Sequence, residues 1–218
     1  MKIGVLFDLD GTLLNTLEDL RDSVNYALGQ YGCPERDLEQ IRKAIGTGAR
    51  NLIVKSLPGL ESDPPVDEVL ATYQEYYAAH SQIKTRPYDG ILEALEQIGK
   101  KYPIAIVSNK PDIAVKILCA DYFPGVFARG ESDDCKRKPA PDMLQKAMAK
   151  IGVDACVYVG DSDVDVVTAK NTKAPCLSVL WGFRDRACME AAGGTYFCDD
   201  PKNMPAMLDK IIEEQYGK

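Results

Sequence analysis

The chain has 218 residues, of which 45% are hydrophobic, and a formal net charge of -7. This composition is typical of a globular protein, and the length suits one large domain or a domain with an insertion. The acidic balance, without any basic block, argues against nucleic acid as a partner. No apolar run reaches the roughly 18 residues that a membrane span requires, so we expect no membrane partner. An anionic substrate would need positive charge supplied locally.

The seven cysteines and the single histidine, His80, do not suggest a metal site with Cys or His ligands. The number of cysteines is odd and no two have C-x-x-C spacing, which argues against zinc. Several lie in apolar, strand-like runs, so we interpret them as small buried hydrophobic residues in a reducing compartment. With no signal peptide before the first strand, we expect a cytoplasmic protein. The sequence does not indicate an oligomeric state.

The first apolar run, Ile3 to Phe7, predicts a buried strand of a parallel sheet, and Asp8 and Asp10 follow it directly. Buried charge is costly unless it is paired or binds a metal. Ligands of open α/β sheets bind at the carboxyl ends of the strands. We therefore interpret one aspartate as a nucleophile and the other as a general acid and base. Gly11 permits a sharp turn and a close approach of backbone N–H groups to an anion.

From about residue 84 onward, strand-like and helix-like stretches alternate with short connections, which predicts a doubly wound parallel sheet. The expected strands span 104–108, 126–128, 156–160 and 174–180, and the expected helices span 111–122, 140–151, 164–171 and 205–216.

Residues 15–83 contain no convincing strand, and their apolar spacing predicts helices over 17–31, 35–45 and 66–83. The spacing of Thr16 and Asp19 suggests a capping box at the start of the first of these helices. An all-helical domain is therefore inserted after the first strand. We predict a catalytic core of residues 1–14 and 84–218, with a helical cap domain of residues 15–83.

Two further strand ends carry polar segments that suit an anion. Ser108-Asn109-Lys110 offers a hydroxyl and exposed backbone N–H groups before a helix, although such a segment can also be an ordinary turn. Lys138 precedes Pro139 and a predicted helix. Because a cation is unfavourable at a helix N-terminus, a nearby anion would explain the position of Lys138. The alternative interpretation is a solvated basic turn.

A fourth segment, Gly160-Asp161-Ser162-Asp163-Val164-Asp165, again follows a predicted strand. Its alternating acidic residues suggest a calcium loop, but Val166 occupies the sixth position, where glycine is needed, and Thr172 the twelfth, where glutamate is needed. A few carboxylates together with waters and a substrate phosphate suit Mg²⁺ better.

In this order, the four segments resemble the motifs of haloacid dehalogenase-superfamily phosphatases. The motifs are Asp8-Leu9-Asp10-Gly11-Thr12, Ser108-Asn109-Lys110, Lys138-Pro139-Ala140-Pro141 and Gly160-Asp161-Ser162-x-x-Asp165. The insert resembles the family's C1-type cap on a Rossmann-like core. Gly46-Thr47-Gly48-Ala49-Arg50, Pro87-Tyr88-x-Gly90 and Val179-Leu180-Trp181-Gly182-Phe183-Arg184 are similar to bacterial phosphoglycolate phosphatases. The chain departs from the usual pattern at Asn15-Thr16, where Asp-Ser is more usual, and at Thr172-Lys173, where Ala-Gly is common.

The resemblance implies a magnesium-dependent phosphomonoester hydrolase that works through an aspartyl-phosphate. Asp8 would attack phosphorus, and Asp10 would protonate the leaving group and then activate water. Asp8, the backbone oxygen of Asp10 and Asp161 would hold Mg²⁺. Asp165 would support these ligands and pair with Lys138, which would neutralise the phosphoryl charge.

The resemblance also implies how the substrate, a small phosphorylated metabolite, is held. Ser108, Asn109, Gly11 and Thr12 would bind the phosphoryl group. We predict 2-phosphoglycolate as the substrate and Arg50, in the cap, as the cation for its carboxylate. A pyrophosphatase or nucleotidase on the same scaffold, a phosphomutase similar to β-phosphoglucomutase and a non-catalytic binding protein are the alternatives.

Overall fold

The computed structural model describes residues 1–217, so Lys218, the last residue of the predicted core, lies outside it. The strands are β1 (Ile3–Phe7), β2 (Leu14–Asn15), β3 (Arg86–Pro87), β4 (Ile104–Pro111), β5 (Phe127–Glu131), β6 (Ala155–Gly160), β7 (Cys176–Val179) and β8 (Tyr196–Cys198). The helices are α1 (Leu17–Gln30), α2 (Leu38–Ala44), α3 (Ala49–Ser56), α4 (Val66–His80), α5 (Ile91–Gly99), α6 (Asp112–Tyr122), α7 (Asp142–Ile151), α8 (Asp163–Thr172), α9 (Arg186–Ala191) and α10 (Met204–Tyr216), with a 3-10 turn η1 (Pro201–Asn203).

The main sheet confirms the predicted parallel, doubly wound architecture. Its strand order is β5-β4-β1-β6-β7-β8, and every neighbouring pair is parallel. The first strand therefore lies in the middle of the sheet, between β4 and β6. Because parallel strands end at the same edge, this order brings the polar segments after β1, β4 and β6 together.

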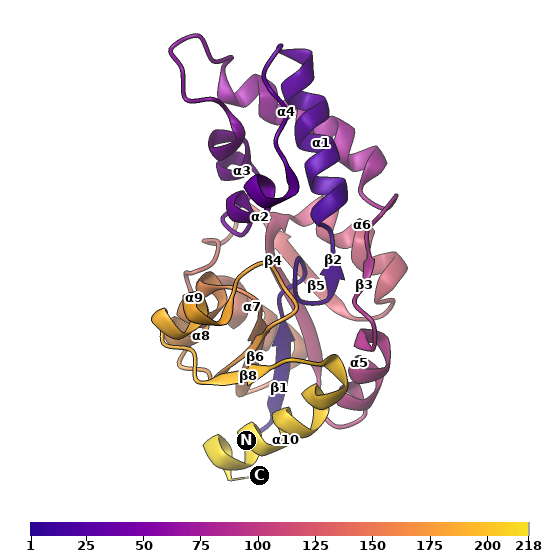
Figure 1. Cartoon of the computed structure of the whole chain (residues 1–218). Coiled ribbons are helices and arrows are strands. Elements are labelled where there is room, and N and C mark those ends of the chain that lie inside the picture. The colour runs from indigo at the N-terminus through magenta and orange to yellow at the C-terminus, as the bar shows by residue number, and fades with distance from the viewer. Residues whose placement is uncertain (218) are drawn as a thin grey trace.

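Helices cover both faces of this sheet, as Figure 1 shows. Side chains of β1 alternate between the two faces, with Val5 and Phe7 in one apolar cluster and Leu6 in the other. Helices α5, α6 and α10 supply the first cluster, and α7, α8 and α9 supply the second. A strand that is buried on both faces needs a continuous apolar sequence, which Ile3–Phe7 provides.

Helices α1 to α4 form a separate layer above the carboxyl edge of the sheet (Figure 1). They share an apolar core that includes Leu20, Ile41, Ile53 and Tyr73, joined by Phe183 from the sheet side. The antiparallel pair β2–β3 lies where the chain enters and leaves this layer. That position supports the predicted division at residues 14/15 and 83/84, which stays a prediction.

The structure also corrects local details. Thr16 and Asp19 do not form a capping box, because the Thr16 hydroxyl donates instead to Asp10 Oδ1 at 2.7 Å. The predicted helix over 35–45 begins only at Leu38, where Asp37 and Gln40 form a true capping box. Helices α3, α5 and α9 and strand β8 were not predicted. All seven cysteines are free, and no helix among residues 1–217 is long and apolar enough to span a membrane.

Candidate active site

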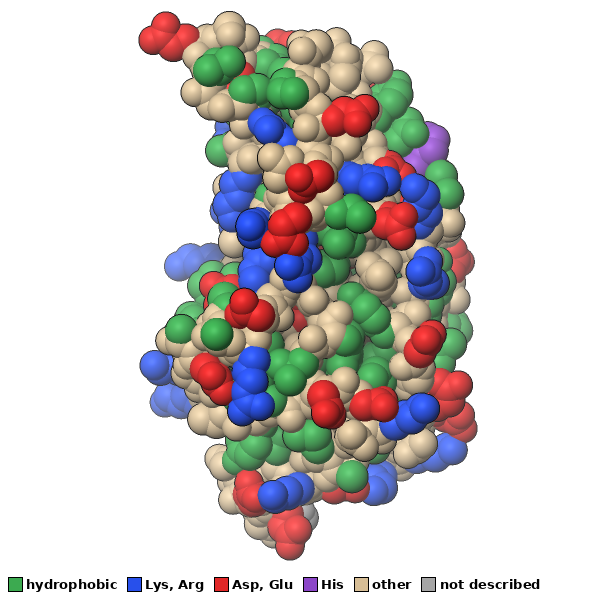
Figure 2. Space-filling view, viewed as in Figure 1, with side chains coloured by type: hydrophobic (Ala, Val, Ile, Leu, Met, Phe, Trp, Pro, Cys, Tyr) green, Lys and Arg blue, Asp and Glu red, His purple; other side chains and the backbone are tan. Residues whose placement is uncertain are grey.

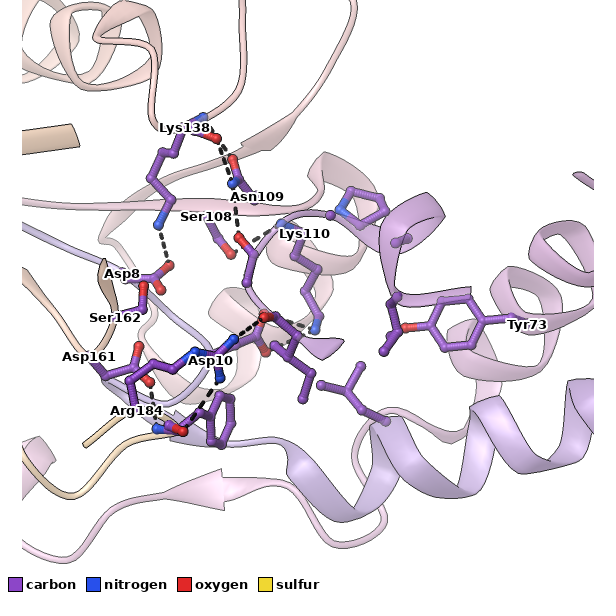
Figure 3. A pocket seen from close by; sticks show the side chains of 18 residues that line it. Asp8, Asp10, Tyr73, Ser108, Asn109, Lys110, Lys138, Asp161, Ser162 and Arg184 are labelled. Atoms are coloured by element: carbon purple, nitrogen blue, oxygen red, sulfur yellow. Dashed lines mark hydrogen bonds and ion pairs between the residues drawn. The ribbon is translucent and has the colours of Figure 1, made fainter. Parts of the chain in front are cut away.

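A pocket lies between the carboxyl edge of the sheet and the helical layer, and Figure 3 shows it from close by. Segments after three adjacent strands, together with the loop that carries Lys138, meet in it. The core contributes Asp8, Asp10, Ser108, Asn109, Lys110, Pro111, Lys138, Asp161, Ser162, Phe183 and Arg184, and the helical layer contributes Leu20, Ile45, Gly46, Gly48, Ala49, Leu52 and Tyr73. The structure thus brings the four segments identified in the sequence into one site.

Lys138 is held by three buried oxygens at the base of the pocket. Its Nζ lies 2.9 Å from Asp8 Oδ1, 2.8 Å from Asp165 Oδ1 and 2.8 Å from the Tyr158 hydroxyl. The contacts with Tyr158 and Asp165 are hydrogen bonds, and the contact with Asp8 is an ion pair. The two carboxylates raise the pKa of Lys138 against the opposing effect of burial, which keeps the amine charged. The anions beside Lys138 are therefore carboxylates of the protein itself.

Asp165 is fully buried and fixed by its own helix. Its Oδ2 accepts hydrogen bonds from the Ser162 backbone N–H and hydroxyl at the start of α8, and its Oδ1 accepts from Lys138 and Tyr158. Gly160 leaves the space that this carboxylate fills, because a Cβ there would lie 2.3 Å from the Asp165 side chain. Asp165 thus pairs with Lys138, and its predicted support of the metal ligands stays a prediction.

Asp161 packs against two glycines and accepts one backbone and one side-chain hydrogen bond. A Cβ at Gly11 or at Gly182 would lie 2.2 Å from the Asp161 side chain, so only glycine fits at either position. Its Oδ2 accepts from the Phe183 backbone N–H at 2.7 Å, and its Oδ1 accepts from the Thr12 hydroxyl at 3.3 Å. Gly11 packs against Asp161 and Thr12 donates to it, and neither residue lines the pocket. Their predicted contact with substrate stays a prediction.

The carboxylates of Asp8, Asp161 and Asp165 form a compact anionic cluster, with one oxygen of each within 4.8 Å of the others. Burial, with a contribution from neighbouring carboxylates, raises the pKa of Asp8 to about 7 and that of Asp161 well above its usual range. The Lys138 contact is an ion pair without hydrogen-bond geometry, so Asp8 Oδ1 lacks a hydrogen-bond partner. Buried oxygen ligands of this kind fit a hard divalent cation such as Mg²⁺.

Asp10 faces the pocket beside a lysine to which the sequence analysis gave no role. Lys110 Nζ donates to both carboxylate oxygens, at 2.9 and 3.1 Å, and Thr16 donates to Oδ1. The Lys110 ammonium also lies 4.7 Å from the centre of the Tyr77 ring on α4. The hydrogen bonds from Lys110 and Thr16 hold the Asp10 side chain. Asp10 is therefore not a member of the carboxylate cluster that Asp8, Asp161 and Asp165 form.

Ser108 and Asn109 differ in what they contact. The Ser108 hydroxyl is buried, lines the pocket and accepts a hydrogen bond from the Lys110 backbone N–H. The Asn109 amide instead joins two loops, accepting from the Lys138 backbone N–H and donating to the Lys138 and Gly46 carbonyls. Asn109 therefore sets the position of the Lys138 loop and also contacts the helical layer.

A second contact between the two layers comes from Arg184. Its guanidinium donates to the carbonyls of Arg42, Lys43 and Ile45 at the C-terminal end of α2. Cations are favoured at this end of a helix, where carbonyls lack partners. This arginine was quoted in the sequence motif but given no role, because its partners lie about 140 residues away in the chain.

The structure does not bring Arg50 to the pocket. The loop around it does line the site, through Gly46, Gly48 and Ala49. Arg50 itself lies in the first turn of α3, is 54% exposed and pairs with Asp67 at 3.2 Å. Its role in substrate binding thus has no contact to support it and stays a prediction.

Comparisons with known proteins identify the family of the chain. The profile of the haloacid dehalogenase-like hydrolases matches residues 5–179. A phosphoglycolate phosphatase of Pseudomonas aeruginosa is 30% identical, with 96% of this chain and 80% of the relative aligned. One from Xanthomonas campestris pv. campestris is 34% identical over 83% of this chain and 84% of the relative. The crystal structure of a candidate phosphoglycolate phosphatase from Lactobacillus delbrueckii subsp. bulgaricus superposes with a TM-score of 0.87 at 35% identity, covering 95% of this chain and 99% of that one. The chain belongs to the haloacid dehalogenase-like hydrolase family.

Proposed function

We propose that this enzyme is a magnesium-dependent phosphomonoester hydrolase that acts through a phosphorylated Asp8, with 2-phosphoglycolate as its preferred substrate. One observation carries the proposal. The Asp8 carboxylate lines the pocket beside a charged lysine, in a cluster of carboxylates that would bind a cation, with a second aspartate two residues away. A nucleophile, a charge-neutralising group and an acid are the set that phosphoryl transfer requires.

In the proposed reaction, an Asp8 oxygen attacks phosphorus while the bond to the ester oxygen breaks. Asp10 donates its proton to that leaving oxygen. Asp10 then takes a proton from water, the water oxygen attacks the aspartyl-phosphate, and the bond between Asp8 and phosphorus breaks to release inorganic phosphate. Lys138 would neutralise charge at the phosphoryl group, and the buried Ser108 hydroxyl, which lines the pocket, would donate to a phosphoryl oxygen.

The cofactor that fits the carboxylate cluster is Mg²⁺. Asp8 and Asp161 would hold it, with the Asp10 backbone oxygen as the ligand implied by resemblance, and Asp165 would act on the site through Lys138. When bound, Mg²⁺ would supply positive charge to the phosphoryl oxygens. Burial, together with repulsion within the cluster, raises the pKa of Asp8 and Asp161, and such a cation would offset both effects.

The position and charge of the pocket support a small anionic substrate. Residues of the helical layer line the pocket opposite the sheet edge, so the space between the layers favours a small ester over a nucleotide. Lys110, Lys138 and Arg184 line it, although the chain carries a net charge of -7. On the face shown in Figure 2, Lys and Arg side chains gather at the level where the helical layer meets the sheet layer. Phosphoglycolate phosphatase activity of the relatives in Pseudomonas and Xanthomonas points to the same ester.

We further propose that residues 15–83 act as a cap that closes over the substrate and excludes water. The Asn109 contact with Gly46 and the Arg184 contacts with α2 support this role, because both join the two layers at the pocket. The enzyme is proposed to work in the cytoplasm, where its seven unpaired cysteines would remain reduced.

A panel of phosphate esters tests the proposal. Purified enzyme in Mg²⁺ should give its highest kcat/KM with 2-phosphoglycolate, above pyrophosphate, nucleoside monophosphates and p-nitrophenyl phosphate. Exhaustive treatment with a chelator should abolish turnover, and added Mg²⁺ should restore it. A higher kcat/KM for pyrophosphate or a nucleotide would refute the substrate, interconversion of glucose phosphates would identify a phosphomutase, and no phosphate release from any ester would refute the phosphatase itself.

A further inference from the structure

We infer that Lys110 determines substrate specificity by binding a carboxylate on the leaving group of the ester. The inference rests on the proposed function and names the feature of the substrate that the pocket would recognise. It also replaces a cation predicted from sequence, Arg50, with one that the structure places inside the pocket.

The other two cations that line the pocket, Lys138 and Arg184, already contact groups of the protein itself. The Lys138 ammonium is hydrogen-bonded to Asp165 and Tyr158 and ion-paired with Asp8, where the phosphoryl group would bind. The Arg184 guanidinium is held by carbonyls at the end of α2. Lys138 is therefore assigned to the phosphoryl group and Arg184 to the contact with the helical layer, which leaves Lys110 for the leaving group.

Lys110 differs because it retains a free donor. Its Nζ makes two hydrogen bonds, both to the Asp10 carboxylate, and no other to residues 1–217. One of its three N–H groups therefore remains available. The side chain is only 4% exposed, so its charge is poorly screened by solvent. A substrate carboxylate could bind this donor without displacing Asp10.

The position of Lys110 matches the place where the leaving group would lie. In Figure 3, Lys138 lies beside Asp8 on one side of the pocket, while Lys110 extends to Asp10 on the side that faces Tyr73 of the helical layer. The attacked phosphorus must lie at Asp8, and the ester oxygen must reach Asp10. The rest of the leaving group then extends beyond Asp10, where Lys110 Nζ is the nearest ammonium.

The Tyr77 ring makes this position suitable for a charged ligand. Packing against an aromatic face holds the ammonium in place from the helical layer. Lys110 is thus preorganised between an aromatic ring and Asp10, and it needs little movement to meet a carboxylate. A neutral leaving group would forgo this interaction, so we expect Lys110 to favour esters that carry a carboxylate close to the ester oxygen.

The test compares two esters of the same shape, 2-phosphoglycolate and its uncharged amide, 2-phosphoglycolamide. We expect wild-type kcat/KM to favour the carboxylate by about 10²- to 10³-fold, of the order observed when a buried charge pair loses one member. In Lys110→Met, which keeps the stem beside Tyr77, this ratio should fall to within about threefold. Lys110→Gln provides a second variant if the methionine protein does not fold, as judged by circular dichroism.

Lys116→Met is the matched control, because Lys116 is an exposed lysine on α6 that pairs with Asp112. It should keep the wild-type ratio. Equal losses on both esters in Lys110→Met would overturn the inference and limit Lys110 to holding Asp10. Loss of the ratio in Arg50→Ala instead would also overturn it. If the wild type hydrolyses both esters equally, the inference alone fails. If it hydrolyses neither, the proposed function fails and the inference fails with it.

Discussion

Replacing Asp8 with asparagine should stabilise the metal-free enzyme above pH 7 while abolishing its activity. The reason is that Asp8 is buried, and burial disfavours its ionised carboxylate. Burial, reinforced by Asp165 and opposed by Lys138, raises its pKa from 3.8 to about 7. Asparagine keeps nearly the same shape and never ionises, so it escapes this penalty. A stabilised, inactive variant is the expected outcome at a strained catalytic site.

The size and sign of the effect follow from the pKa. Because the pKa in the folded state lies above that in the unfolded state, the contribution to stability is fully present below about pH 3.8 and is lost as the pH rises to about 7. At 1.36 kcal/mol for each pKa unit, the loss is about 4 kcal/mol. Burial also raises the pKa of Asp161, which acts in the same direction.

The assay is thermal unfolding in excess chelator between pH 5 and 8. Between pH 5 and 7 the loss is about 3 kcal/mol, which corresponds for a chain of this length to a decrease in Tm of about 5–10 °C. Wild type should lose stability across this range, and Asp8→Asn should follow a shallower curve and exceed wild type at pH 8. The exposed Glu39 and Glu96 have lowered pKa values and titrate below this range. A wild-type Tm that is flat or rising from pH 5 to 8 would refute the reasoning.

Four other variants test neighbouring parts of the account. Lys138→Met should remove nearly all turnover while Lys136→Met costs little, and the reverse would show that the wrong lysine has been assigned. Tyr158→Phe, which leaves one N–H of Lys138 unpaired, should lower stability by about 1.5–3 kcal/mol in denaturant titrations, and an unchanged midpoint would contradict the buried network. Lys173 has a left-handed φ of 61°, so Lys173→Gly should raise stability by about 0.5–1 kcal/mol in the same titrations, and a loss would count against strain there.

The parts of the site that could be predicted are those encoded locally. Asp8 and Asp161 each follow a buried apolar strand, and parallel strands end at one edge of a sheet, so their convergence follows from pattern alone. The sequence analysis also identified Lys173 as a departure from the usual Ala-Gly. The left-handed φ of Lys173 explains why glycine is common at this position.

What could not be predicted depends on contacts between distant segments. The Lys110 bond to Asp10 joins residues 100 positions apart, and the Arg184 bonds to α2 join residues about 140 apart. Arg50 was predicted to bind the substrate carboxylate because it lies beside Gly46 and Gly48. The sequence did not reveal that α3 begins at Ala49 and that the Arg50 side chain pairs with Asp67. Helix α5 was missed although Ile91, Leu95 and Ile98 have helical spacing, so a signal was present.

The central claim is that Asp8 carries the phosphoryl group during turnover. Rapid acid quench of the enzyme with 2-phosphoglycolate and Mg²⁺, followed by peptide mass mapping, tests it directly. The account predicts a phosphoryl group on the peptide that contains Asp8, appearing within one turnover and absent from Asp8→Asn. A phosphoryl group on another residue, or phosphate release by Asp8→Asn at the wild-type rate, would contradict it.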